Sequence, residues 1–176
     1  NGVANLSVVI KDNGGTTDGG DDTSDARTFK ITAQAINDAP AFTKGADQTV
    51  LEDSGKRTVS GWATGMSAGP SDEASQTWTF VVASNNKALF SEQPAVSPEG
   101  VLTFTPGTNA FGTATVTVQM KDNGGTVKPG NTVAGKDTSD AQTFTITIGS
   151  VNDAPSFTKG PDISVPEASG AKSFAS

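Results

Sequence analysis

The sequence predicts an all-β protein, an antiparallel β-sandwich in tandem repeats. Three observations support this prediction: apolar and polar residues alternate along several segments, turn-forming residues are abundant, and one stretch of the chain occurs twice. Hydrophobic residues make up only 34% of the 176 residues, and the chain contains 20 glycines and 9 prolines. This composition favours short strands joined by many turns over long helices.

The duplicated stretch defines the expected domain organisation. Asn37–Gly45 returns as Asn152–Gly160 at an offset of 115 residues, with eight of nine residues identical. Its Asn-Asp-Ala-Pro start is typical of a hinge, because proline ends the preceding element. We therefore expect residues 1–38 to be the C-terminal strands of a preceding repeat, 39–153 a complete β-sandwich repeat, and 154–176 the N-terminal strands of a following repeat. On this interpretation the chain is a window on a longer protein.

The first expected strand is Val3–Ile10, which ends in the turn Lys11–Thr16. The same six residues return as Lys121–Thr126 at an offset of 110, whereas Thr23–Phe29 returns as Thr138–Phe144 at an offset of 115. The difference in length falls between the two blocks. A length change confined there predicts a surface loop between two strands.

Three further segments alternate strictly between apolar and polar residues: Thr77–Val82, Phe111–Met120 and Thr143–Ile148. Such alternation indicates strands of an antiparallel sheet with one buried face. Shorter strands are expected at Gln48–Leu51, Arg57–Ala63, Lys87–Phe90 and Val101–Thr105. The total is about seven strands in about 115 residues, the count of an immunoglobulin-like sandwich.

The aromatic residues give one firm expectation and one open question. Trp78 lies with Phe80 and Val82 on the inward face of its strand, so we expect Trp78 to anchor the core. The pattern leaves the direction of Trp62 open.

Absent residue types and charge exclude several functions. The chain has no Cys, His or Tyr, which removes disulfides, thiol chemistry, histidine-based catalysis and most zinc or copper sites, so we expect no enzyme activity. The net charge is −7, which disfavours nucleic acid as a partner and favours divalent cations. No apolar run approaches the roughly 18 residues of a membrane span, so no membrane insertion is expected.

The candidate functional residues are acidic and amide side chains near the ends of the expected modules. Calcium takes roughly six to eight oxygen ligands, several of them carboxylates, and loops from two modules meet at one junction. The alternative is that Asn-Asp-Ala-Pro and Asp-Asn-Gly-Gly are only turns. The candidate metal ligands are Asn37, Asp38, Glu52, Asp72, Glu73, Asp122, Asn152, Asp153 and Glu167.

Three motifs carry a resemblance to a known family: Val151–Phe157, Lys121–Gly125 and Ser67–Glu73. The chain resembles cadherin-like repeats, specifically the bacterial Val-Asn-Asp-Ala-Pro repeats of large surface and secreted adhesins. The resemblance implies an immunoglobulin/cadherin-like Greek-key β-sandwich in tandem repeats, with calcium bound between repeats.

The resemblance also divides the candidate ligands between two junctions. It implies that the second junction uses Glu52, Asn152 and Asp153, with Glu167 as the copy of Glu52 in the next repeat. Ala35 and Ser150 stand where the family has an acidic residue, so about one or two calcium ions per junction are implied, or none with the turns retained. The first junction is implied to use Asn37, Asp38, Asp72, Glu73 and Asp122.

The leading hypothesis is therefore a structural spacer or adhesion repeat of a long extracellular or cell-surface protein, with calcium-stiffened junctions between neighbouring repeats. A second hypothesis is a subunit of an extracellular filament, in which incomplete terminal modules exchange strands and the chain self-associates. A third is a carbohydrate-binding module, which needs exposed aromatic side chains. Trp62 is the residue on which that third hypothesis depends.

Overall fold

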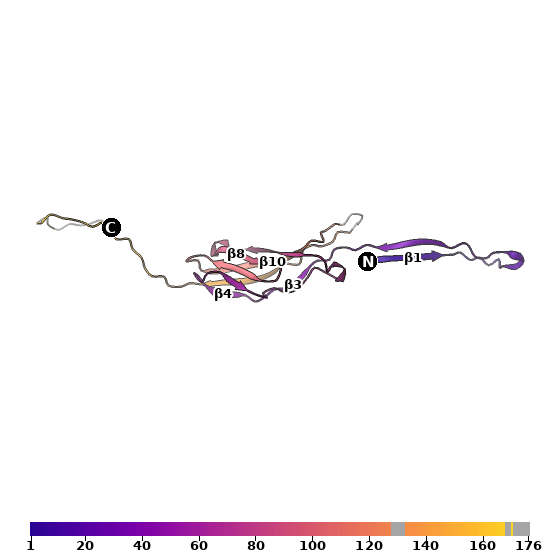
Figure 1. Ribbon diagram of the computed structural model, residues 1–176, viewed down its shortest axis with the longest axis horizontal. Helices are drawn as coiled ribbons and strands as arrows, with labels where there is room; N and C mark the ends of the chain where they lie inside the picture. The colour runs from indigo at the N-terminus through magenta and orange to yellow at the C-terminus, as the bar shows by residue number, and fades with distance from the viewer. Residues whose placement is uncertain (128–132, 168–169, 171–176) are drawn as a thin grey trace.

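A computed structural model describes residues 1–127, 133–167 and 170. The described chain is all-β, as the sequence predicts, and consists of strands with three single-turn 3-10 helices. It forms three parts in a row: an N-terminal hairpin, a sandwich-like body of packed sheets, and an extended C-terminal segment that leaves the body at the end opposite the hairpin (Figure 1). Within the described residues, no helix has the length and apolar character needed to cross a membrane.

The hairpin pairs β1 (Gly2–Val8) with β2 (Arg27–Ala33) in antiparallel register. Its connection contains the 3-10 turn η1 (Thr17–Gly19), where Asp18 has a φ of 58°. Both strands are exposed almost throughout, because the two-stranded sheet stands apart from the body.

The first layer of the body is a four-stranded sheet in the order β4-β11-β10-β7. β4 runs parallel to β11, and the other neighbours are antiparallel. The strands are β4 (Gln48–Leu51), β7 (Trp78–Ser84), β10 (Gly112–Asp122) and β11 (Gln142–Gly149).

The second layer contains the three-stranded sheet β5-β9-β8 and the short pair β3-β6, all antiparallel. Two 3-10 turns flank β7 along the chain, η2 (Ser71–Glu73) and η3 (Lys87–Leu89). The strands are β3 (Ala41–Thr43), β5 (Arg57–Val59), β6 (Thr64–Ser67), β8 (Phe90–Val96) and β9 (Leu102–Pro106).

The core lies between the two layers and follows the predicted alternation. The inward residues of β10, from Ala114 to Met120, are fully buried, and so are Phe144, Ile146 and Ile148 of β11. Leu102 and Phe104 of β9 pack against them from the other layer. The two-residue period of the sequence therefore identified the buried face of the central strands correctly.

Trp78 differs from its expected role as the core anchor, and Trp62, whose direction the sequence leaves open, lies in the core. Trp62 is the buried one, with 3% of its surface exposed, whereas Trp78 is half-buried and packs at the margin of the core. Trp78 pairs with Asp122 at the last position of the β7–β10 ladder, where the interior ends. Trp62 follows β5, and its indole packs on Phe144 at a centroid distance of 4.5 Å.

Two of the expected strands have wrong bounds. The expected strand Lys87–Phe90 is the turn η3, and the strand β8 begins only at Phe90, since Asn85 and Asn86 form a turn that runs into η3. The expected strand Arg57–Ala63 ends at Val59, because the chain turns at Gly61 with a φ of 64°. The strand β6 that follows was not predicted.

The hairpin has the same register as β10–β11. Each pair from Gly2↔Ala33 to Val8↔Arg27 has its counterpart in β10–β11 at the sequence offsets of 110 and 115 residues. The ion pairs that follow the first strand also correspond, at 3.2 Å for Lys11–Asp22 and 3.3 Å for Lys121–Asp137. The two copies of the sequence therefore fold locally in the same way.

Candidate functional site

The linker between the hairpin and the sandwich is fixed to the body through Asn37. This side chain is buried, with 4% of its surface exposed. Its Nδ2 donates to Asp122 Oδ1 at 3.0 Å and to the Lys136 carbonyl at 2.6 Å, and its Oδ1 accepts from Gln76 Nε2 at 2.8 Å. The Asn37 carbonyl also accepts from Lys136 N at 2.8 Å. One asparagine thus joins the linker to three separate loops.

Two glycines make room for this asparagine. A Cβ on Gly124 would fall on Asn37 Oδ1, and a Cβ on Gly135 would lie 2.8 Å from the Asn37 carbonyl oxygen. Gly124 N also donates to Asp122 Oδ1 at 2.9 Å, which closes the Asp-Asn-Gly-Gly turn. The first glycine of this turn is therefore required by the approach of the linker, in addition to hairpin geometry.

Glu73 makes a second connection to the same linker. Its side chain is buried, and its Oε1 accepts from Asp38 N at 3.1 Å. Gly69 lies so close to the other carboxylate oxygen, Oε2, that a Cβ on Gly69 would collide with it. The Asp38 side chain is exposed, and so is Asp72, whose Oδ2 accepts from Asn1 Nδ2 at 3.0 Å.

All five residues expected at the first junction therefore lie at the hairpin end of the sandwich. Asn37 contacts Asp122 directly, and Asp38 contacts Glu73 through its backbone. Asp72 takes no part in these contacts and accepts a hydrogen bond from Asn1, at the start of the hairpin.

The opposite end of the sandwich holds the second set. Glu52 is buried, and its Oε1 accepts from Val151 N at 2.7 Å. Asn152 Nδ2 donates to the Asp153 carbonyl at 3.3 Å, as Asn37 Nδ2 donates to the Asp38 carbonyl at the same distance. Both Asn152 and Asp153 are exposed, and Glu167 lies exposed on the C-terminal segment. Only Glu52 of this set is enclosed by the body.

Among the described residues, four buried oxygens at these two ends have no hydrogen-bond donor. They are Glu73 Oε2, Asp122 Oδ2 and Gln76 Oε1 at the first junction, and Glu52 Oε2 at the second. Burying an acceptor without a partner is unfavourable by about 1–3 kcal/mol, and more for a charged one. All four are the hard oxygen ligands that calcium prefers. These residues fit a calcium ion chemically.

The ligand set is partial. Among the residues that the structure describes, no three acidic side chains converge closely enough to hold a metal ion by themselves. At the first junction, backbone carbonyls, the Gln76 amide and water would have to complete the coordination.

A charged pair stands beside the first junction. The Thr138 hydroxyl donates to the Asp137 carboxylate and holds its pKa below the ordinary value, and Lys121 acts in the same direction. Asp137 follows Lys136, and its carbonyl accepts from Asp122 N at 2.9 Å. The ionised Asp137 therefore helps to hold the loop that carries the Lys136 contacts to Asn37.

Sequence reasoning missed several participants in this site. Gln76 carried no signal, because an isolated glutamine in a polar loop has no pattern around it. The contacts of Lys136 are made by its backbone, so its side chain gave no signal either. Gly135 was not singled out, although a glycine at a sheet end often marks the close approach of another segment.

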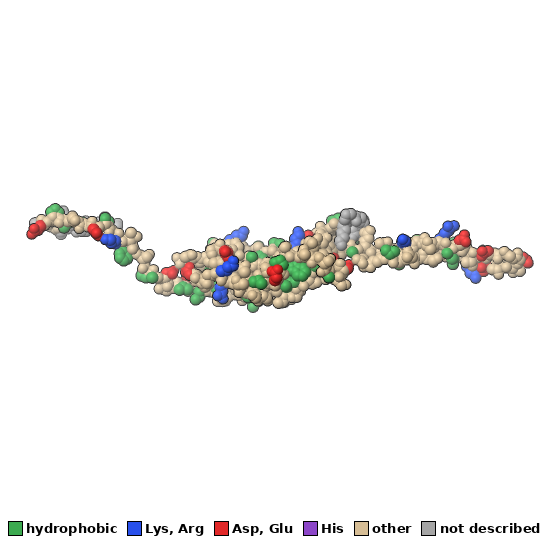
Figure 2. All heavy atoms as spheres, in the orientation of Figure 1, with side chains coloured by type: hydrophobic (Ala, Val, Ile, Leu, Met, Phe, Trp, Pro, Cys, Tyr) green, Lys and Arg blue, Asp and Glu red, His purple; other side chains and the backbone are tan. Residues whose placement is uncertain are grey.

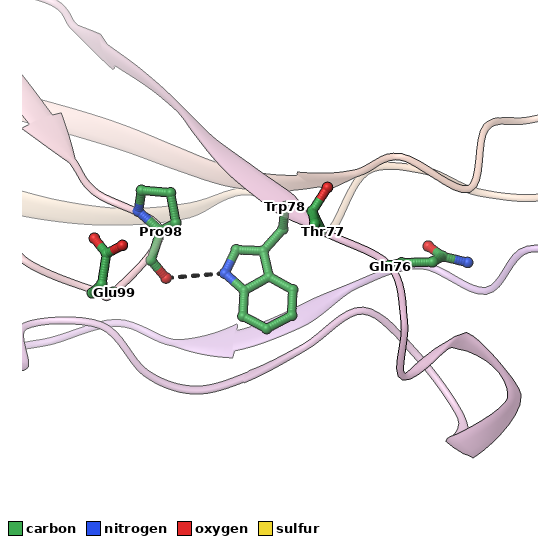
Figure 3. A pocket seen from close by; sticks show the side chains of 5 residues that line it. All are labelled: Gln76, Thr77, Trp78, Pro98 and Glu99. Atoms are coloured by element: carbon green, nitrogen blue, oxygen red, sulfur yellow. Dashed lines mark hydrogen bonds between the residues drawn. The ribbon is translucent and has the colours of Figure 1, made fainter.

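A pocket next to this site is lined by one of the two tryptophans. A pocket of about 410 Å³ is lined by Gln76, Thr77, Trp78, Pro98 and Glu99 (Figure 3). There the Trp78 Nε1 donates to the Pro98 carbonyl at 3.0 Å, which fixes the indole at the pocket wall. Trp62 is not an exposed aromatic, since it is buried and its Nε1 donates to the Ala46 carbonyl at 3.0 Å.

Comparisons with protein families, curated proteins and solved structures found no match.

Proposed function

We propose that this chain is part of a structural spacer, built of tandem immunoglobulin/cadherin-like modules in an extracellular or cell-surface protein and stiffened by calcium at the junctions. The buried linker residue Asn37 supports this proposal. A linker that only tethered two domains would remain exposed, whereas Asn37 is held by hydrogen bonds to three loops of the next module. A fixed linker transmits orientation from one module to the next.

The fold is compatible with such modules. The two facing layers, each mainly antiparallel, are what an immunoglobulin-like sandwich requires, and they support the proposal to that extent. The shared register of the hairpin and β10–β11 supports a repeating unit. The partners of this chain would then be neighbouring repeats, and no catalytic step is proposed.

The calcium part of the proposal depends on one observation: three buried oxygens without donors lie around one linker, on Glu73, Asp122 and Gln76. A divalent cation would supply the positive charge that these acceptors lack. It would also tie Glu73, whose other oxygen binds the linker backbone, to the turn that begins at Asp122. Calcium would act here as a cross-link between the linker and two loops.

The expected strength is modest. Extracellular calcium modules bind with dissociation constants of about 10⁻⁴–10⁻³ M. At ten times the dissociation constant, binding stabilises the bound form by about 1.4 kcal/mol per site. This amount is small for a folded domain of this size, but it shifts the balance between a fixed and a freely moving junction about tenfold.

Removal of calcium is therefore expected to loosen the junction and leave the sandwich folded. The measurement is solution scattering with calcium and with a chelator. With chelator, the distribution of interatomic distances should broaden, because the hairpin samples many angles. Circular dichroism should stay unchanged. Identical scattering curves in the two conditions would contradict a calcium-stiffened junction.

Substitutions at the first junction are expected to weaken calcium binding. Glu73→Gln and Asp122→Asn each remove one negative charge from the buried oxygens while keeping the side-chain shape. Calorimetric titration should show at least a tenfold loss of affinity, about 1.4 kcal/mol. Glu92→Gln is the matched control, since Glu92 is exposed and pairs with Lys56 at 3.0 Å. Equal calcium affinity in all three variants would mean that the ion binds elsewhere.

A further inference from the structure

The hairpin has an apolar face, and none of the other residues that the structure describes forms a sheet with it. At the corresponding positions of β10–β11, the side chains are 0–3% exposed. In the hairpin the exposed fractions are 49% for Val8, 74% for Ile10, 49% for Phe29 and 54% for Ile31. On the side shown in Figure 2, charged side chains of both signs are scattered over the hairpin and the sandwich.

The hairpin also has an open edge. In the sandwich, Thr145 N donates to Asp47 Oδ1 at 2.9 Å, and the Gly149 carbonyl accepts from Glu52 N at 2.9 Å. The backbone N–H and C=O groups of every second residue of β11 thus point toward β4. By the shared register, the backbone groups of Lys30, Thr32 and Gln34 face outward from β2. Within the described residues, β2 pairs with β1 alone.

The segment that would fit this edge is present at the other end of the chain. Residues 154–167 repeat 39–52, with nine of fourteen residues identical, and 48–51 is the strand β4 that covers the edge of β11. In this copy no strand is formed between residues 154 and 167. Ile163, Val165 and Phe157 are exposed by 54%, 52% and 89%, although Phe42, the counterpart of Phe157, is buried in the core.

We propose that residues 162–166 of one copy of this chain add as a parallel strand to the free edge of β2 in a second copy. The register follows from β4–β11, where Ile146 faces Gln48 and Gly149 faces Leu51. Ile163 then lies opposite Ile31, and Pro166 lies opposite Gln34. Val165 takes the place of the buried Val50, and Phe157 enters the apolar face of the hairpin in the place of Phe42.

Side chains at both ends of the added strand support this pairing. Glu167 corresponds to Glu52, whose Oε1 accepts from Val151 N, so Glu167 can accept from Ile36 N of the second copy. Asp162 corresponds to Asp47, and the position of Thr145 is occupied in β2 by Lys30, which adds an opposite charge.

Two sequence differences bear on the fit. Pro166, which has no N–H, corresponds to Leu51 of β4. Because Glu52 N faces β11, the N–H of Leu51 points away from β11. The added strand therefore needs no N–H donor at Pro166. Arg27 replaces Gln142, whose Oε1 accepts from Lys44 N at 3.2 Å, and this single bond is lost because arginine cannot accept.

The occupant is a second copy because of the shape of the chain. The hairpin and the C-terminal segment leave opposite ends of the sandwich (Figure 1), so the segment points away from the hairpin of its own chain. Head-to-tail pairing gives a closed ring where the rotation between copies closes, and an open, longer assembly where it does not. The pairing uses backbone hydrogen bonds and apolar contacts, so it does not depend on calcium.

The test is sedimentation of the full chain over a wide range of concentration, in chelator. Association that increases with concentration is expected. Val165→Asp, which places a charge on the inward face of the added strand, should leave a monomer. Ser164→Asp places the same charge on the outward face, at the position of the exposed Thr49, and should associate like the parent chain. A parent chain that stays monomeric at all concentrations overturns the proposal.

A mixing experiment separates this mode from others. Thr32→Pro removes an N–H from the open edge of β2 and keeps the C-terminal segment intact, while Val165→Asp keeps the edge intact. Each variant alone should be monomeric, and the mixture should form a heterodimer that grows no further. Association of Val165→Asp alone would indicate that two hairpins pack face to face, and it would overturn the proposal. So would a mixture that stays monomeric.

Discussion

Replacement of Trp62 by alanine is expected to lower the free energy of unfolding of the sandwich by about 3–5 kcal/mol. The indole is almost fully buried, packs on Phe144 and donates its Nε1–H to the Ala46 carbonyl. Alanine leaves a cavity between the layers, and the Ala46 carbonyl keeps only the exposed hydrogen bond from Gln48 Nε2. Chemical denaturation followed by circular dichroism measures the effect. The remaining Trp78 supplies an independent fluorescence signal.

Trp78→Ala is the matched control, since it removes the same side chain from the margin of the core. A smaller loss is expected, because Trp78 is half-buried and its hydrogen bond to Pro98 is exposed. Equal losses for the two variants would contradict the assignment of Trp62 as the buried aromatic. Gly45 supports the assignment, because a Cβ there would lie 2.5 Å from the Trp62 ring.

Gly124→Ala is expected to detach the linker from the sandwich. The new methyl group would occupy the position of Asn37 Oδ1, so the asparagine must leave its hydrogen bonds to Asp122, Gln76 and Lys136. Each buried polar group left without a partner destabilises by about 1–3 kcal/mol. Faster hydrogen exchange at the Lys136 amide, which donates to the Asn37 carbonyl, together with a broader scattering profile, would report the released linker.

Gly14→Ala tests whether the effect comes from the linker or from the turn. Gly14 is the copy of Gly124 in the hairpin, and a Cβ there would meet only Asp12 Oδ1, at 3.2 Å. Its alanine variant should leave hydrogen exchange at Lys136 unchanged. If both alanine variants release the linker, the turn itself is responsible and the proposed fit of Asn37 against Gly124 is wrong.

The long strands of the central sheet were predictable because the alternation of apolar and polar residues is a local property of the sequence. Alternation along Gly112–Asp122 and Gln142–Gly149 reports directly which side chains face the interior. The strands β5, β6 and β8 of the second layer were predicted less well. β5 and β6 are short, the register of β8 is irregular, and Pro94 within β8 weakens the strand signal. Trp62 lies outside any strand, so no period could give its direction.

The site was predictable in its parts and not in its contacts. The repeat placed Asn37 at a hinge, and the acidic residues were expected near module ends. The contacts join residues far apart in sequence, such as Asn37 with Asp122, and depend on how the loops fold over the sheet. No local pattern shows that Gln76 reaches the linker or that Gly135 faces its backbone. Whether calcium occupies the junction remains a prediction.

The parallel pairing of β4 with β11 has a mechanical consequence. The chain enters the sandwich ahead of β4 and leaves it after β11, at the opposite end (Figure 1). Tension applied through both neighbours pulls these two strands past each other along their length. The hydrogen bonds between them are then loaded together in shear and cannot open one at a time. Resistance to stretching is therefore set by the shortest strand of the sheet, Gln48–Leu51, and by the Glu52 contacts that follow it.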